Sequence, residues 1–439
     1  MTDQTVSPHR LGLLGAIMLI GSNMIGSGIY MLPATLGAVG SISLLSWLIA
    51  GAGAIFLALV FGFLGVLRPD SHGVVTYAGE ALHPALGHVS WFVYWLGCWI
   101  SNSAVTVGLV GYLGYFIPAL KDPTISVVGC LIAVWALSIA NMVGPKLVAR
   151  IGGATLMIGL VPVLMATGVG LMAFSPDLFH ASWNVSGKPE GVAMSGAVTP
   201  IFFAFLGLEG GNIAARVISN PRRNLPIAAI GGVLVAGTIY IAASAAIMGL
   251  LPAARLATST APFADAIVPV VGAVAAGLVA LCAFAKTTGT LGAGILFAAE
   301  SQRSGVAAGF MPRVLSDPKS HNPTREILLT GLLSSLAILA TASSTLGGQF
   351  LTLINVTVVL SLIFYLLCAL SLLRLSTELP KPSQRFASRL AAALAALFCL
   401  WVMATTDASL RIPALGVVGV SLGLWAVGRG AARLRPPQP

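Results

Sequence analysis

The chain alternates long apolar runs with short polar segments that often contain proline. About 20 apolar residues are enough to cross a bilayer as a helix, and the pattern predicts twelve such spans. They lie at about residues 11–37, 41–67, 86–119, 124–143, 146–174, 191–216, 225–250, 265–299, 326–345, 349–374, 387–405 and 410–428. Breakers such as Arg68-Pro69-Asp70 keep the loops short. We therefore expect an all-α polytopic membrane protein with a single membrane domain.

Glycine and polar residues interrupt the first and sixth runs near their midpoints. The two interruptions read Gly21-Ser-Asn-Met-Ile-Gly-Ser-Gly28 and Phe205-Leu-Gly-Leu-Glu-Gly-Gly-Asn212. Glycine costs a helix about 1 kcal/mol relative to alanine, and broken backbone at membrane depth is tolerated only beside protein or a water-filled cavity. Both spans are therefore predicted to unwind beside a cavity, where the freed N–H groups favour an anion such as a carboxylate. The alternative is that the glycines only let two helices approach closely.

The two interrupted spans occupy matching positions if the chain contains two halves of five spans. The halves are residues 11–174 and 191–374, and residues 387–428 form two accessory spans. Five spans per half place the halves in opposite orientation, which predicts a 5+5 inverted repeat. Paired glycine-interrupted spans at matching positions point to the binding site of a secondary transporter.

The charge pattern defines the topology. Only 8% of residues are charged, whereas soluble domains carry about 25%. With the N-terminus inside, 18 of the 23 Lys and Arg lie on the inner side and four on the outer side, which predicts that both termini are cytoplasmic. This bias also explains the net charge of +10 without a nucleic-acid partner. The five cysteines lie in apolar runs without metal or redox spacing, so we expect no cofactor and no metal.

Two ionisable residues lie deep in the predicted spans, Glu209 in span six and Lys286 in span eight. Such a residue at mid-membrane costs at least about 2.5–3.5 kcal/mol and points to function. We interpret Glu209 as a proton acceptor whose charge state biases the inward- and outward-facing forms. The alternative is a structural hydrogen bond that holds the broken helix.

Seven stretches resemble the amino acid–polyamine–organocation superfamily. They are Asn23–Pro33, Tyr94–Asn102, Asn141–Lys146, Trp183–Gly187, Phe205–Glu209, Asn220–Ala228 and Ser259–Phe263. Over about residues 11–430 the chain is most similar to the bacterial basic amino acid/polyamine antiporters, which exchange arginine for agmatine, lysine for cadaverine or ornithine for putrescine. The resemblance implies a LeuT-like 5+5 fold of twelve helices with helices 1 and 6 broken, in the inner membrane of a bacterium. Family members are often dimers, so a homodimer is also implied.

The resemblance also implies a set of site residues. The backbone of Gly26, Ser27 and Gly28 would hold a substrate carboxylate, and the carbonyls from Phe203 through Ala204 to Leu206 would hold the α-amino group. The other implied residues that face or line the site are Asn23, Tyr94, Gly97, Cys98, Asn102 and Thr357. Glu209 would match the acid that links proton binding to the transport cycle.

The chain departs from the arginine exchangers at two aromatic positions. Those relatives stack and gate the guanidinium with tryptophans on spans six and eight, where this chain has Phe203 and Gly294. Because a cation–π contact is strongest with tryptophan, we expect the site to bind a cationic side chain less strongly.

Lys286 is a further oddity, and three functional interpretations stay open. It pairs with Glu209, it places its amine where sodium-coupled relatives hold a cation between spans one and eight, or it touches substrate. The structural alternative is a snorkelling lysine, although Lys286 lies deep for that. A fixed cation would repel a dicationic diamine and suits a substrate with a carboxylate, unless Lys286 is neutral or paired.

These features favour an exchanger of an arginine-like amino acid for a related amino acid or an amine such as agmatine. The alternative in the same class is a proton-coupled symporter or exporter of neutral amino acids. An amino acid sensor would bind at the same site without turnover. An intramembrane enzyme is disfavoured, because the chain has one deep carboxylate and no histidine at mid-span.

Overall fold

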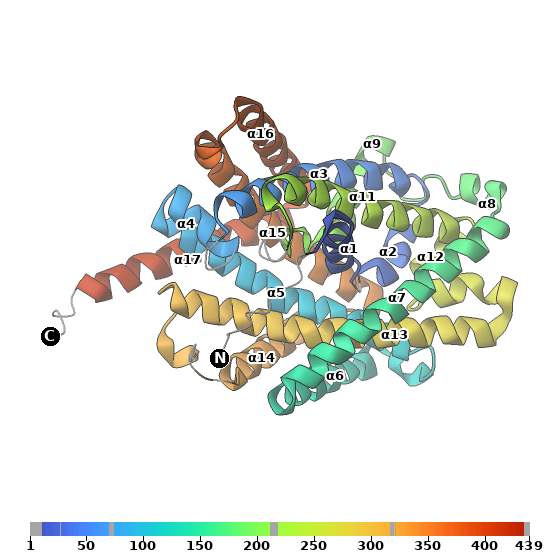
Figure 1. The fold of residues 1–439 in the computed structure, drawn as a ribbon. Coiled ribbons are helices and arrows are strands. Elements are labelled where there is room, and N and C mark those ends of the chain that lie inside the picture. The colour runs from blue at the N-terminus through green and yellow to red at the C-terminus, as the bar shows by residue number, and fades with distance from the viewer. Residues whose placement is uncertain are drawn as a thin grey trace, which may run out of the picture.

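The computed structural model describes residues 11–26, 28–69, 74–210, 218–316, 320 and 322–433. Their ordered backbone is helical, and the described part contains no strand beyond an isolated bridge between Leu11 and Ile218. Figure 1 shows the helices α1 Leu13–Met24, α2 Gly28–Gly37, α3 Ser43–Leu67, α4 Tyr77–Ala81, α5 Pro84–Leu113, α6 Pro123–Val143, α7 Pro145–Met172, α8 Pro176–Ala181, α9 Glu190–Phe202, α11 Pro221–Met248, α12 Ala253–Ala257, α13 Pro262–Ala307, α14 Thr324–Ala340, α15 Leu346–Leu375, α16 Pro382–Thr405 and α17 Ala408–Arg433. Short 3₁₀ turns include η3 Phe203–Phe205, η4 Leu208–Gly210 and η6 Ser376–Glu378.

The all-α polytopic class is confirmed, and a helix lies at each of the twelve predicted runs. Within the described residues, nine helices are long and apolar enough to cross a membrane, or ten when the bent pair α1 and α2 counts as one span. Helix α7 has 28 residues and α14 has 17. The number of twelve spans and the inverted repeat therefore stay predictions.

Several element boundaries differ from the predicted ones. Helix α13 has 46 residues and continues to Ala307, eight residues past the predicted end at 299. Near its start Gly272 has a φ of +80°, which interrupts the regular helix. The predicted span 86–119 is shorter in the structure, because α5 ends at Leu113 and a 3₁₀ turn, Pro118–Lys121, follows.

The helices pack in two groups. In the first, α1 packs against α11, α11 against α3, and α3 against α9; in the second, α13 packs against α5 and α7, and α14 against α5 and α6. Figure 1 shows α3 and α11 on one side of α1 and α15, with α13 on the other side. The helices α1 and α9 of the interrupted spans thus belong to the first group, and α2 also contacts α13 of the second group.

Small residues let the helices of the first group approach closely. A Cβ built on Gly21 of α1 would lie 3.4 Å from the carbonyl oxygen of Gly232 on α11, and a Cβ on Gly232 would lie 3.0 Å from the nitrogen of Gly21. Contacts of this kind drive helix association in lipid, where burial of apolar surface does not. Close packing therefore explains one glycine of the first interruption, but not the break that follows it.

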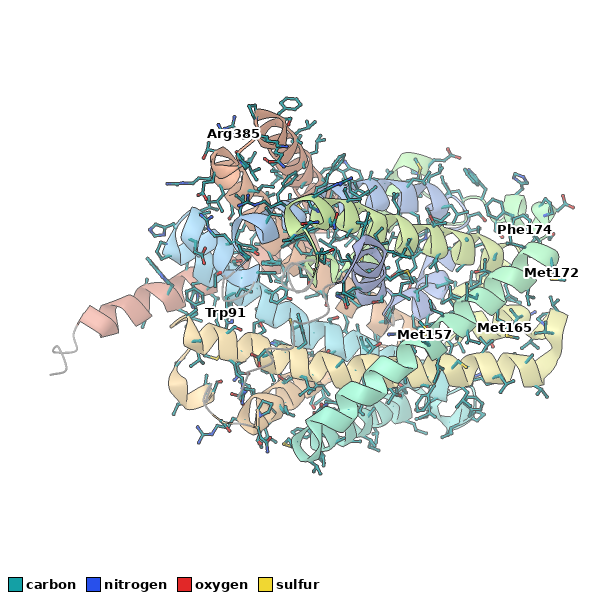
Figure 2. All side chains as sticks on the ribbon, viewed as in Figure 1. Trp91, Met157, Met165, Met172, Phe174 and Arg385 are labelled. Atoms are coloured by element: carbon teal, nitrogen blue, oxygen red, sulfur yellow. The ribbon has the colours of Figure 1, made fainter. Side chains whose placement is uncertain are left out.

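Apolar side chains cover the outward faces of the helices. Met157 and Met172 on α7, labelled in Figure 2, are 63% and 89% exposed. Val143 at the end of α6 and Leu14 on α1 are likewise 85% and 72% exposed. A belt of exposed apolar side chains on membrane-length helices is the surface expected to face lipid.

Candidate functional site

The first span breaks where the sequence predicts. Helix α1 ends at Met24 and α2 begins at Gly28, with a bend of 53° between them. The Ile25 N–H still bonds to the Gly21 carbonyl, and the Gly26 N–H turns back to the Met24 carbonyl. Ser27 of the predicted carboxylate site lies outside the described residues.

The sixth span breaks as well. Helix α9 ends at Phe202, η3 follows, and Leu206 then takes an extended conformation with a ψ of 145°. Gly207 has a φ of +98°, a left-handed conformation that residues with a side chain rarely adopt. These local conformations explain why the sequence places glycine at this position.

A single tyrosine hydroxyl hydrogen-bonds to both breaks. The Tyr240 hydroxyl on α11 contacts the Met24 carbonyl at 2.7 Å and the Ala204 carbonyl at 3.1 Å. The breaks also touch directly, since a Cβ on Gly207 would lie 2.9 Å from the carbonyl oxygen of Asn23. The two unwound segments therefore form one connected unit in the centre of the protein.

A cavity of about 970 Å³ lies against this unit, between the broken helices, α5, α13 and α15. Its lining includes every predicted substrate-facing residue that the structure describes: Asn23, Gly26, Gly28, Tyr94, Gly97, Cys98, Asn102, Phe203, Ala204, Leu206 and Thr357. Glu209 also lines the cavity, whereas Lys286 does not. Sequence reasoning missed the contribution of α13, where Thr290, Ala293 and Phe297 recur at helical spacing on the cavity side.

Glu209 is 9% exposed and is held by three hydrogen-bond donors. The Tyr365 hydroxyl donates to Oε2 at 2.7 Å, the Gly207 N–H donates to the same oxygen at 3.2 Å, and the Tyr94 hydroxyl reaches Oε1 at 3.4 Å. The Tyr365 distance matches a hydrogen bond to a charged carboxylate, and the Tyr94 distance exceeds the usual range. Tyr365 lies 156 positions from Glu209, so no local sequence signal indicated this contact.

Lys286 lies in a different environment. It is 7% exposed, and its Cγ would lie 2.5 Å from a Cβ on Gly159 of α7, so only glycine leaves room for its stem. The Tyr30 hydroxyl donates to the Gly159 carbonyl beside it. Among the described residues Lys286 has no hydrogen-bond or ion-pair partner. The interpretation that Lys286 pairs with Glu209 therefore does not hold in this conformation.

The two positions that depart from the arginine exchangers are both tightly packed. A Cβ on Gly294 would lie 2.2 Å from Oδ1 of Asn102, so the Asn102 amide occupies the space a side chain would need. Asn102 is 4% exposed, and its Nδ2 has no partner among the described residues. The Phe203 ring lies against Gly28, 2.9 Å from the position of a Cβ there. Asn102 thus lines the cavity, while its Nδ2 is buried and has no partner among the described residues.

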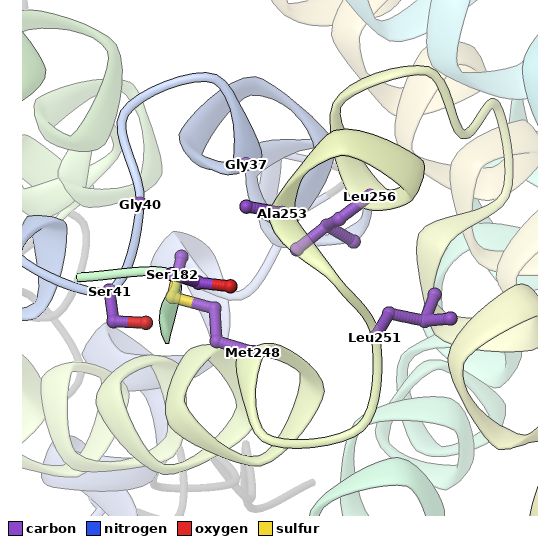
Figure 3. Close-up of a pocket in the computed structure, with 8 residues that line it drawn as sticks. All are labelled: Gly37, Gly40, Ser41, Ser182, Met248, Leu251, Ala253 and Leu256. Carbon is purple, nitrogen blue, oxygen red and sulfur yellow. The ribbon is translucent and has the colours of Figure 1, made fainter. Parts of the chain in front are cut away.

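Among the described residues, the cavity reaches exposed side chains at one end, and helices pack closely beyond the other end. It extends past Phe297, which is 47% exposed, to Arg68, Glu300 and Arg303. At the opposite end α12 packs closely on α2. The approach is so close that a Cβ on Gly37 would lie 2.8 Å from the nitrogen of Ala257. Figure 3 shows the crevice left at this contact, which has no room for a water molecule.

Ion pairs hold both arginines at the open end. Arg68 makes two hydrogen bonds to Glu378, at 2.7 and 2.9 Å, and lies 3.6 Å from Glu80. The hydrogen bond to Glu378 is the main reason why the pKa of Arg68 is raised above its usual value. Arg303 contacts Glu326 at 3.3 Å.

Residues 11–414 match the model of a family described as amino acid permease. The chain is 32% identical to a cadaverine/lysine antiporter of Escherichia coli (strain K12) over 400 residues, which is 90% of this chain and 89% of the relative. It is 31% identical to the putrescine transporter PotE of the same organism, over 90% of each chain. It is also 29% identical to a putrescine transporter PotE of Haemophilus influenzae, over 82% of this chain and 83% of the relative.

Proposed function

This chain belongs to the amino acid permease family, and from that premise we propose that it exchanges a cationic amino acid for a related amine across a bacterial inner membrane. The observation that carries the proposal is the 970 Å³ cavity, which joins the breaks of two membrane helices and has the Glu209 carboxylate in its wall. Matching breaks in two spans are the pointer to a transporter's substrate site. The relatives named as antiporters of cadaverine and lysine or as transporters of putrescine support this class of substrate.

In this proposal the substrate binds between the two breaks. Its carboxylate meets the positive end of α2 at Gly26 to Gly28, where a helix N-terminus favours an anion. Its α-amino group bonds to the carbonyls from Phe203 to Leu206, and the Asn102 amide turns toward the substrate and donates the N–H that has no partner among the described residues. A decarboxylated amine lacks only the first contact, so one site accepts both exchange partners.

Glu209 would couple a proton to the transport cycle. In its ionised form it stabilises the conformation in which Tyr365 donates to it, and protonation weakens that bond. The bundle of spans 1, 2, 6 and 7, that is α1, α2, α3, α9 and α11, would rock against the remaining helices to move the opening from one side to the other. By the charge bias of the loops, the end with Arg68 and Arg303 is cytoplasmic, which makes this conformation inward-facing.

Lys286 would give the exchanger a fixed positive charge outside the cavity lining, instead of a bound metal cation. Its stem lies between α13, α7 and the Tyr30 side chain of α2, three elements that meet behind the first break. Because the amine has no partner among the described residues, it is free to interact with the backbone of the first break during the cycle. Sodium independence is the expected consequence.

An exchange assay in proteoliposomes tests the substrate class. Vesicles are preloaded with agmatine, cadaverine, putrescine, a neutral amino acid or buffer, and uptake of labelled arginine, lysine and ornithine is measured for each. We expect uptake of at least one cationic amino acid only with a cationic preload, and arginine with agmatine is the first pair to test. Uptake of a neutral amino acid without preload, driven by an inward proton gradient, would replace the proposal with proton-coupled symport.

A further inference from the structure

The outer part of the cavity carries a carboxylate that the proposed site does not use. Glu300 lies on α13, six residues beyond Gly294, which is about 9 Å along a helix. It lines the cavity and is exposed. Among the described residues it has no hydrogen-bond or ion-pair partner. A substrate amine that moves between the opening and the deep site must pass this carboxylate.

An aromatic ring stands beside Glu300 on the same face of the helix. Phe297 lies one turn closer to the deep site, and residues three apart are neighbours on a helix surface. It lines the cavity and is 47% exposed, and its ring is 6.2 Å from that of Tyr94, at an angle of 68°. Aromatic faces attract ammonium groups. The pair thus offers a cation both a ring face and a charge.

The two arginines at the opening do not neutralise the negative charge of Glu300, because each is paired with another carboxylate. Arg68 is bound by Glu378 and Glu80, and Arg303 is bound by Glu326. Each described arginine of this outer part of the cavity, the vestibule, therefore has its own carboxylate, and Glu300 has no cationic partner among the described residues.

We propose that Phe297 and Glu300 form a second amine subsite in the vestibule, where a primary ammonium group of a cationic substrate binds before it reaches the deep site or after it leaves. This inference rests on the proposed function and adds a residue pair that distinguishes cationic from neutral substrates. The subsite raises the local concentration of cations at the opening, an effect that salt screens. It compensates in part for the ring contacts that a glycine at position 294 cannot make.

Variants of the full chain in proteoliposomes test this subsite. In E300Q we expect KM for a cationic substrate to rise about threefold to fivefold, as for the loss of one solvent-screened charge pair, while kcat changes less than about twofold. KM of the wild type should rise with salt, and that dependence should be weaker in E300Q. E300D should restore both properties, and F297L should weaken binding about twofold to threefold. Asp177→Asn is the matched control, since Asp177 is an exposed acid on α8 at the closed end.

Binding of cadaverine to purified protein separates this inference from the proposed function. If the wild type exchanges no cationic substrate but E300Q still binds cadaverine about threefold to fivefold more weakly than D177N, the exchange proposal fails and the subsite stands. If E300Q and D177N bind cadaverine equally, or if the wild type does not bind it, the subsite is overturned.

Discussion

Tyr365→Phe and Tyr94→Phe form a matched pair that tests the hydrogen bonds of Glu209. Both changes remove one hydroxyl and keep a ring in place. The Tyr365 ring contacts Phe61 and Phe364 with centroids 5.4 Å apart, and the Tyr94 ring lies 4.7 Å from that of Phe364. Since these ring contacts survive in phenylalanine, both variants should fold.

The two hydroxyls differ in the strength of their hydrogen bonds to the Glu209 carboxylate. A hydrogen bond to a charged group contributes about 1.5–3 kcal/mol, and the Tyr365 bond has the short length, 2.7 Å, of that class. At 1.4 kcal/mol for each factor of ten, exchange that requires ionised Glu209 in this conformation should fall roughly 10-fold to 100-fold in Tyr365→Phe. The Tyr94 hydroxyl is 3.4 Å away, so its removal should lower exchange less than about threefold through this contact.

Exchange of a labelled cationic amino acid, measured across a pH series in proteoliposomes, gives the result. Glu209→Gln defines the level reached without an ionisable group. The reasoning is refuted if Tyr94→Phe impairs exchange as much as Tyr365→Phe, or if Tyr365→Phe exchanges like the wild type at equal protein incorporation.

Three further variants test the packing around the site. Gly207→Ala should destabilise the break by about 1–3 kcal/mol, because it imposes a positive φ on a residue with a side chain and brings its Cβ to 2.9 Å from the Asn23 carbonyl oxygen; an unchanged Tm in detergent would contradict this. Gly294→Ala should displace the Asn102 amide and weaken substrate binding about twofold to tenfold, which is the effect of losing one neutral hydrogen bond. If calorimetry finds wild-type affinity for this variant, Asn102 does not contact the substrate. Lys286→Met keeps an unbranched stem and removes an amine without a described partner, so Tm should stay at or above that of the wild type while exchange falls more than about tenfold; full exchange would make Lys286 a packing residue.

The positions of the two breaks could be predicted because they follow from local chemistry. Glycine in an apolar run is unfavourable in a helix, and the structure indeed ends α1 at Met24 and leaves Gly207 with a φ of +98°. Membrane-length helices are equally local, since each needs only a run of apolar residues. The all-α polytopic fold therefore followed from hydropathy alone.

The contacts between distant spans could not be predicted in the same way. Tyr365 and Tyr240 act on the breaks from spans ten and seven, and nothing in their own neighbourhoods marks them. The surroundings of Lys286 depend on Gly159, which leaves room for its stem. That glycine is one of 50 in the chain. The sequence showed two deep ionisable residues and left their pairing as one of three interpretations, because side-chain reach and packing decide whether such residues meet.

Span eight has Gly294 where the arginine exchangers have a tryptophan, and the structure shows which group fills that space. At Gly294 the sequence indicated a lost ring. In the structure the Asn102 amide occupies the space beside Gly294, so the position carries a hydrogen-bonding group from another helix. The aromatic surface of this helix lies one turn further along the cavity, at Phe297.

Trans-stimulation of uptake tests the central claim, obligatory exchange through this cavity, most directly. Labelled lysine or arginine is added to proteoliposomes that contain either the corresponding amine or buffer, with no proton gradient. We expect rapid uptake only into amine-loaded vesicles, and Glu209→Gln and Asn102→Ala should reduce this uptake. Equal uptake into empty vesicles would rule out obligatory exchange.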